Sequence, residues 1–143
     1  MIDRRFALAS LLITGAVALA GCGMMDRDKG GAMTVPLSSQ NEVPPNASGG
    51  SGTAKVELDG NVIKWTVSYS GLTGPVTAGH FHGPAQPGAN AGVVLPFAGP
   101  LASPFTGSAT LTQAQVDQVK GGLWYVNLHT AANPGGEIRG QVK

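Results

Sequence analysis

The stretch GTAKVELDGNVIKWTVSYSGL, residues 52–72, decides the fold class of this chain. Apolar side chains occupy the even positions from 54 to 58 and, after a break, the odd positions from 63 to 69. Alternation with a period of two is typical of strands that bury one face. The break is Asp59-Gly60-Asn61, a combination that favours a tight turn. The stretch therefore predicts an antiparallel β-hairpin.

Five further segments with apolar or alternating residues predict strands, and glycine, proline or asparagine separates them. They are VTAGHFHGP (76–84), GVVLPFAG (92–99), FTGSATLT (105–112), LWYVNLHT (123–130) and GEIRGQVK (136–143). One segment, LTQAQVDQVKGG (111–122), has a helical pattern, in which Thr112 caps the first turn with Gln115 three residues on. Short strands with a single helix predict an all-β fold, an antiparallel Greek-key β-sandwich or barrel.

The amino terminus has the pattern of an export signal. Arg4 and Arg5 precede an apolar run over residues 6–19, which is short for a membrane span and ends in Leu19-Ala20-Gly21-Cys22. This ending resembles a bacterial lipobox, which implies cleavage before Cys22 and attachment of lipid acyl chains to it. We expect a signal peptide over 1–21, a lipidated tether over 22–33 and one domain over 34–143. An uncleaved membrane anchor is the alternative.

Two further features of the amino-terminal half bear on location and stability. Gly23, rather than Asp, follows the cysteine, and by the sorting rule for such lipoproteins this predicts an outer-membrane anchor facing the periplasm. Cys22 is the only cysteine, so no internal disulfide can form.

The charges of the chain argue against nucleic acid as a partner. Loss of residues 1–21 would remove Asp3, Arg4 and Arg5 and leave seven basic and seven acidic residues. Binding to phosphates relies on clustered positive charge, and the sequence has no Lys/Arg cluster.

The three histidines are candidate ligands of a transition metal. His80 and His82 in TAGHFHGP (77–84) fall on the same face of a strand, and His129 lies near the end of the strand LWYVNLHT. Imidazole nitrogens suit copper and zinc, and three of them leave a coordination position open. The alternative is that these are ordinary surface histidines, because the sequence does not establish that two segments so far apart converge.

Glu42, Glu137 and Arg139 form a second group in a chain with few charges. Glu137 and Arg139 share a strand face, and Glu42 can pair with Arg139 across strands. The favoured interpretation is a structural ion pair that joins the first strand to the last. An additional oxygen ligand from Glu42 or Glu137 is the second interpretation.

No motif for catalysis is present. The sequence has neither a G-x-S-x-G nucleophile motif nor a P-loop, and we expect a protein that is not an enzyme. The main alternative to metal binding is a protein- or matrix-interaction module with structural histidines. It would contact an envelope partner through exposed sheet edges or the loop PAQPGANAG (84–92).

Four segments carry a resemblance to a known family. LSSQNEVPP (37–45), SGLTGPVTAGHFHGP (70–84), GSATLTQAQVDQVKGGLWYVNLHT (107–130) and NPGGEIRGQV (133–142) resemble the CHRD domain, over roughly residues 35–143. One departure is Gly79 and Phe81, where the family more often has Ala and Ile around the histidine pair. The resemblance implies a sandwich similar to immunoglobulin or superoxide dismutase domains.

The resemblance also has consequences for function. Bacterial members of the family imply an envelope protein with a role in metal binding, copper above all. Carried onto this sequence, that role falls on His80, His82 and His129. Copper/zinc superoxide dismutase uses a fourth histidine at copper, whereas this chain has three in total, so dismutation is not expected.

Overall fold

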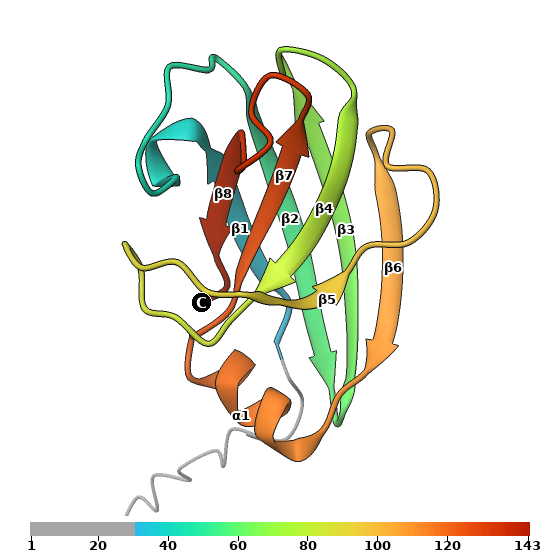
Figure 1. Cartoon of the computed structure of the whole chain (residues 1–143). Helices are drawn as coiled ribbons and strands as arrows, with labels where there is room; N and C mark the ends of the chain where they lie inside the picture. Colours follow the sequence, from blue (N-terminus) through green and yellow to red (C-terminus); the bar gives the residue numbers. More distant parts are fainter. Residues whose placement is uncertain (1–30) are drawn as a thin grey trace, which may run out of the picture.

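The computed structural model describes residues 31–143 (Figure 1). The expected signal peptide, Cys22 and the tether as far as residue 30 lie outside the described residues. The elements are β1 (Met33–Ser38), η1 (Ser39–Asn41), β2 (Ser51–Asp59), β3 (Val62–Ser70), β4 (Val76–His82), β5 (Val93–Pro96), β6 (Phe105–Thr110), α1 (Gln113–Lys120), β7 (Tyr125–Thr130) and β8 (Ile138–Gln141).

The hairpin predicted from residues 52–72 is confirmed as β2 and β3. The two strands pair antiparallel, with Val56 opposite Trp65 and Ala54 opposite Val67. All four side chains face the core and are at most 5% exposed. Gly60 has a φ of 58° in the turn, a conformation that glycine adopts without steric cost. The period-two pattern therefore gives both the strands and their register.

The strands form one antiparallel sheet in the order β5-β4-β7-β8-β1-β2-β3-β6. The sheet curls, so that β5, β4, β7 and β8 lie in front of β1, β2, β3 and β6 (Figure 1). The two layers are joined where Ser38 of β1 pairs with Arg139 of β8. This arrangement confirms the predicted all-β antiparallel sandwich, with the layers continuous along one side.

Aromatic side chains fill the space between the layers. The Phe81 ring centroid lies 5.4 Å from that of Trp65 and 5.0 Å from that of Phe97, both in edge-to-face contact. Such contacts are favourable beyond the area they bury. Because the fully buried Phe81 points inward from β4, its neighbours His80 and His82 point to the outer face of the same strand.

Helix α1 closes one end of the sandwich below the strands (Figure 1). Thr112 and Gln115 form the expected capping box, in which each side chain bonds the backbone of the other residue. Val116 and Val119 are buried, so the helix is stabilised by packing as well as by its cap. Within residues 31–143, no helix has the length and apolar character needed to cross a membrane.

Candidate metal centre

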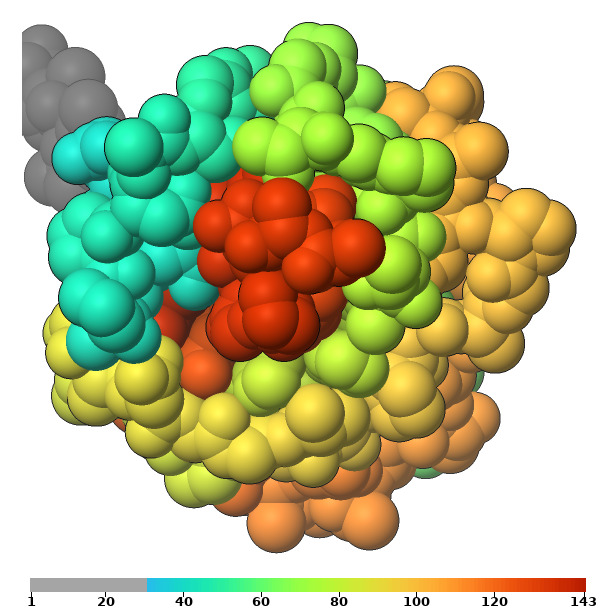
Figure 2. Space-filling view, turned by 45° about the horizontal axis from the view of Figure 1, so that its top comes forward, coloured from blue at the N-terminus to red at the C-terminus, as the bar shows by residue number. Residues whose placement is uncertain are grey.

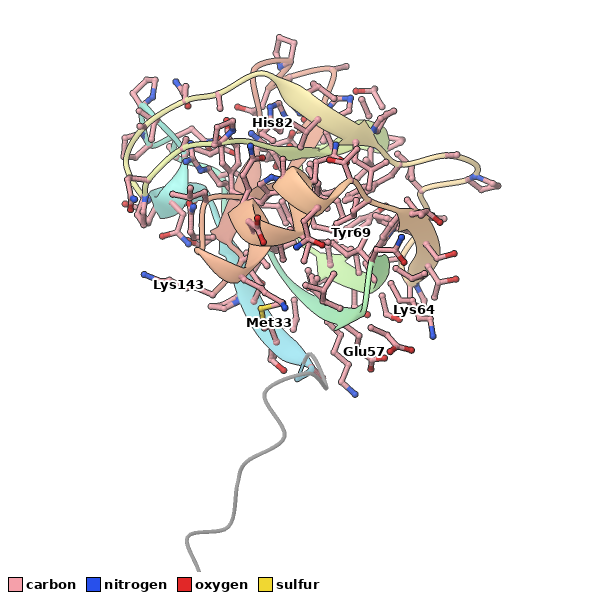
Figure 3. All side chains as sticks on the ribbon, turned by 90° about the horizontal axis from the view of Figure 1, so that it is seen from below. Met33, Glu57, Lys64, Tyr69, His82 and Lys143 are labelled. Atoms are coloured by element: carbon pink, nitrogen blue, oxygen red, sulfur yellow. The ribbon has the colours of Figure 1, made fainter. Side chains whose placement is uncertain are left out.

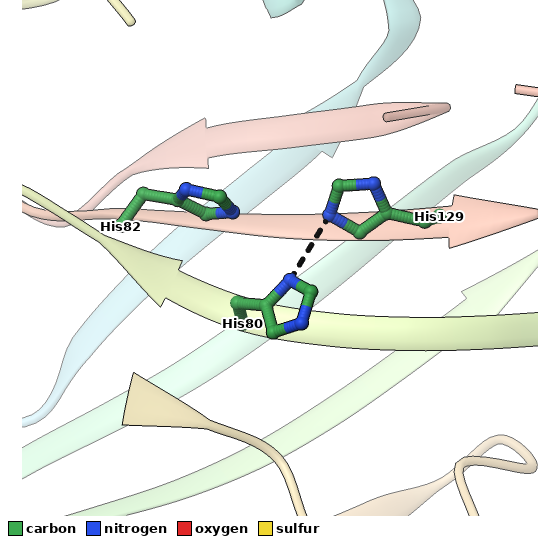
Figure 4. Close-up of side chains that lie close together, drawn as sticks. All are labelled: His80, His82 and His129. Atoms are coloured by element: carbon green, nitrogen blue, oxygen red, sulfur yellow. Dashed lines mark hydrogen bonds between the residues drawn. The ribbon is translucent and has the colours of Figure 1, made fainter. Parts of the chain in front are cut away.

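The pairing of β4 with β7 brings the three histidines together. In this register His80 lies opposite Asn127, His82 opposite Tyr125, and His129 opposite Ala78. All three imidazoles project from the outer face of the front layer and converge on one another (Figure 4). The sequence left open whether two segments so far apart converge, and in the structure they do.

One nitrogen from each histidine lies within 4.8 Å of the other two. The closest pair is His80 Nδ1 and His129 Nε2, which are 3.1 Å apart and hydrogen-bonded (Figure 4). We compared the positions of the His, Cys, Asp and Glu residues in the described part of the chain. The three histidines form the group whose arrangement could hold a metal ion.

Backbone carbonyls fix the protonation of two of the rings. His82 Nδ1 lies 3.0 Å from the carbonyl oxygen of Ala91, and His129 Nδ1 lies 2.9 Å from that of Pro134. A carbonyl can only accept, so the proton of each neutral ring is on Nδ1 and the lone pair is on Nε2. Such outer contacts orient metal-ligating histidines in known sites.

His82 Nε2 is a buried atom with no hydrogen-bond partner in the structure. Leaving a polar atom buried and unpaired costs free energy, typically about 1–3 kcal/mol. The acceptor that this nitrogen presents lies within the histidine cluster and is the atom that a cation would use. The donor set thus fits a transition metal.

The surroundings keep two of the imidazoles neutral. Burial lowers the pKa of His80 below its ordinary value, and the charges of His129 and His82 lower it further. Burial is also the main cause of the lowered pKa of His82. Its backbone hydrogen bonds to Ala91 and Gly92 raise the pKa, and the charges of His129 and Arg139 lower it further. Neutral imidazole is the form that binds a metal.

Glu42 contacts Asn127, the residue opposite His80 in the β4–β7 pairing, and is not part of the histidine group. Its Oε2 accepts a hydrogen bond from Asn127 Nδ2 at 3.4 Å, and its Oε1 is buried without a partner. Burial raises the pKa of Glu42 to about 7, against the opposing effects of Arg139 and Asn127. Within residues 31–143, no hydrogen bond joins Glu42 to Arg139. The charge of Arg139 lowers the pKa of Glu42 through space.

Glu137 is buried and joins three loops. Its carboxylate accepts hydrogen bonds from the hydroxyls of Ser48, Thr73 and Thr130 and from the backbone N–H of Thr73. Burial alone would raise the pKa of Glu137, but these four donors together lower it to about 2. The carboxylate is thus an anion held by the protein, outside the histidine cluster.

Arg139 is hydrogen-bonded to the segment that crosses the outer face of the front layer. Its Nη1 donates to Asn90 Oδ1 at 3.0 Å and its Nη2 to the carbonyl of Ala89 at 2.7 Å. We call residues 84–92, which run from β4 toward β5, the strap. Asn90 Nδ2 also donates to the carbonyl of Val43, so the strap and the loop after η1 are tied together beside the histidines.

The face that carries the cluster is hollowed. Figure 2 shows a depression between the red loop that joins β7 to β8, the teal chain near residue 45 and the yellow chain near residue 90. A cavity of about 520 Å³ lies between the strap and the loop after η1, with Arg139 among its lining residues. Figure 3 shows that His82 and the Glu57–Lys64 pair lie on opposite sides of the sandwich.

Fold and site together define an antiparallel β-sandwich domain with three convergent imidazoles on the outer face of one layer. The family model for the CHRD domain matches residues 33–142, from β1 to beyond β8, and the chain belongs to this family. Comparison with curated proteins and with solved structures gave no match.

The sequence did not reveal several groups that support the site. The carbonyls of Ala91 and Pro134 hold two of the imidazoles, and backbone groups leave no residue-type signal in a sequence. Tyr125 and Asn127 share a strand face with His129 because side chains alternate along a strand, but their contacts depend on which strands become neighbours. Those neighbours, β4 and β8, are set by the sheet order.

Proposed function

We propose that this protein is a lipid-anchored envelope protein that binds one transition metal ion through His80, His82 and His129. The buried, unpaired Nε2 of His82 within a cluster of three imidazole nitrogens carries the proposal. Copper is the first candidate and zinc the second, because imidazole nitrogens favour both and copper(II) stands highest in the usual order of affinities.

The same donor set argues against hard cations. Calcium and magnesium prefer oxygen ligands, whereas the cluster offers nitrogen. Glu137 is engaged with hydroxyl groups, Glu42 contacts Asn127 through one oxygen, and neither carboxylate is part of the histidine group. Three protein ligands leave one coordination position open for water. A molecule that delivers the ion or takes it up could also supply a ligand at this position. This suits metal storage, delivery or tolerance, and it requires no catalytic step.

The anchoring half of the proposal rests on the sequence. An apolar run that ends in Leu19-Ala20-Gly21-Cys22, followed by Gly23, favours lipid attachment at Cys22 and an outer-membrane location facing the periplasm. Mass spectrometry of the protein extracted with detergent tests this directly. A lipid-modified residue 22 at the amino terminus is expected, and a chain that retains residues 1–21 contradicts it.

The metal site is tested on the full-length protein, purified in detergent without a histidine tag. Competition with chelators should show one equivalent of bound copper, and zinc should bind at the same site. His80→Ala, His82→Ala or His129→Ala should lower the affinity at least about tenfold, because loss of one of three ligands removes a large part of the binding free energy. Glu57→Gln, on the opposite side of the sandwich (Figure 3), is the matched control.

Two outcomes contradict the proposal. One is wild-type protein that takes up no copper or zinc at micromolar concentrations, and the other is a triple alanine variant that binds as the wild type does. The physiological part is tested with cells that produce either the wild type or the His80→Ala variant. Growth in excess copper should be better with the wild type if the protein serves tolerance.

A further inference from the structure

Tyr125 contacts His82 in two ways at once. The two rings are stacked, with centroids 4.9 Å apart and planes inclined by 3°. The Tyr125 hydroxyl lies 3.1 Å from the backbone nitrogen of Ala91 and 3.2 Å from its carbonyl oxygen. The same carbonyl accepts the proton of His82 Nδ1. One side chain therefore packs on the imidazole and also holds the group that fixes its proton.

Arg139 completes the stack from the other side of the tyrosine. Its guanidinium carbon lies 3.4 Å from the centroid of the Tyr125 ring, a close cation–π contact. Its nitrogens bond Ala89 and Asn90, which directly precede Ala91 in the strap. Arg139 is 2% exposed and Tyr125 likewise, so neither side chain has room to leave this arrangement.

We propose that Tyr125 is the positioning residue of the site, which keeps the proton of His82 on Nδ1 and its Nε2 lone pair directed into the histidine cluster. This inference rests on the proposed metal site. An imidazole that can exchange its two tautomers offers the metal the correct nitrogen only part of the time. The stacked Tyr125 ring and the Ala91 carbonyl prevent this tautomer exchange before an ion binds. Ligands that are already oriented bind with a smaller loss of entropy.

The proposal explains a feature that metal ligation by itself leaves unexplained. A buried nitrogen without a partner would normally turn to find one, and the His82 ring could do so by rotation. Stacking against Tyr125 and the bond to Ala91 oppose that rotation. His80, which is only partly buried, has no such carbonyl partner in the described structure and bonds His129 instead.

The test compares Tyr125→Phe with Tyr69→Phe in the full-length protein. Tyr69→Phe is a matched control, because it also removes a hydroxyl that bonds a backbone carbonyl, that of Leu101. Long-range ¹H–¹⁵N NMR of the imidazoles reports the tautomer of the metal-free protein. We expect a single Nδ1–H form of His82 in the wild type and in Tyr69→Phe, and a mixture in Tyr125→Phe. Copper affinity should fall about 10- to 100-fold in Tyr125→Phe alone.

An unchanged tautomer and an unchanged affinity in Tyr125→Phe would overturn the inference. If the wild type binds no metal, the proposed function fails, while the NMR result still decides the role of Tyr125. Should Tyr125→Phe not fold, Asn90→Ala replaces it. This change removes one strap contact to Arg139 and one to Val43, and the same two readouts should shift in the same direction; if neither does, the inference is wrong.

Discussion

The Nδ1 of His80 lies 3.1 Å from the Nε2 of His129, although 49 residues separate the two in sequence. A hydrogen bond joins these two nitrogens. It exists because β4 and β7 are neighbours in the sheet and Phe81 and Leu128 both point into the core. Burial of Phe81 and Leu128 in the core thus places the histidines of the two strands side by side on the outer face.

Metal binding should depend on pH only under acidic conditions. The pKa values of His80 and His82 are lowered from 6.5, chiefly by burial. Protons therefore begin to compete for these two nitrogens at a lower pH than at free histidine. Affinity measured by chelator competition should change little from pH 8 to pH 7 and fall below about pH 6. A steep loss between pH 8 and pH 7 would contradict the neutral state of these rings.

Much of the fold could be predicted because local patterns matched tertiary packing. The alternation in residues 52–72 gave β2 and β3, and Thr112 with Gln115 marked the start of α1. The side of the strand on which His80 and His82 lie followed from the same alternation. In these segments local propensity and burial favour the same structure.

Convergence of the histidines needed the topology, which no local pattern contains. His129 approaches His80 because the chain leaves β4, crosses to the other layer for β6 and returns to pair β7 against β4. Glu137 gives a second case. The sequence showed it beside Arg139, but its partners Ser48 and Thr73 come from loops whose positions depend on the whole sheet.

Gly136→Ala should destabilise the protein strongly. Gly136 has a φ of 130°, and a Cβ there would lie 2.5 Å from Asn127 Oδ1 and 2.8 Å from Glu42 Oε1. Backbone strain and overpacking together should lower the free energy of unfolding by about 2–5 kcal/mol. Urea denaturation measures this loss.

Gly135→Ala is the matched control for this prediction. A Cβ at the neighbouring residue 135 meets nothing within 4 Å. We expect its free energy of unfolding to stay within about 1 kcal/mol of the wild type. Equal effects of the two substitutions would show that the close approach of Gly136 to Asn127 does not matter for stability.

Glu137→Gln should cost on the order of 3 kcal/mol at pH 7, because the lowered pKa of Glu137, about 2, reflects hydrogen bonds that favour the charged form. A group with a lowered pKa adds stability above its unfolded pKa, and this stability is lost as the pH falls through the folded value. The difference between wild type and variant should therefore shrink to less than half near pH 3. Denaturation at both pH values checks it, with Glu57→Gln expected to change little at either.

Glu42→Gln should have the opposite pH dependence. Burial raises the pKa of Glu42 to about 7, so the folded state holds this proton more tightly than the unfolded state does. A raised pKa adds stability that is complete below the unfolded value of 4.5 and is lost as the pH rises through about 7. Glutamine resembles the protonated acid, so the variant should gain on the wild type as the pH rises, by up to about 3 kcal/mol at pH 8 relative to pH 4.5. His80 and His82 titrate in both proteins and cancel in the comparison. A difference that stays constant across this range, or that favours the wild type more at pH 8, would mean that Glu42 is already ionised in the folded protein.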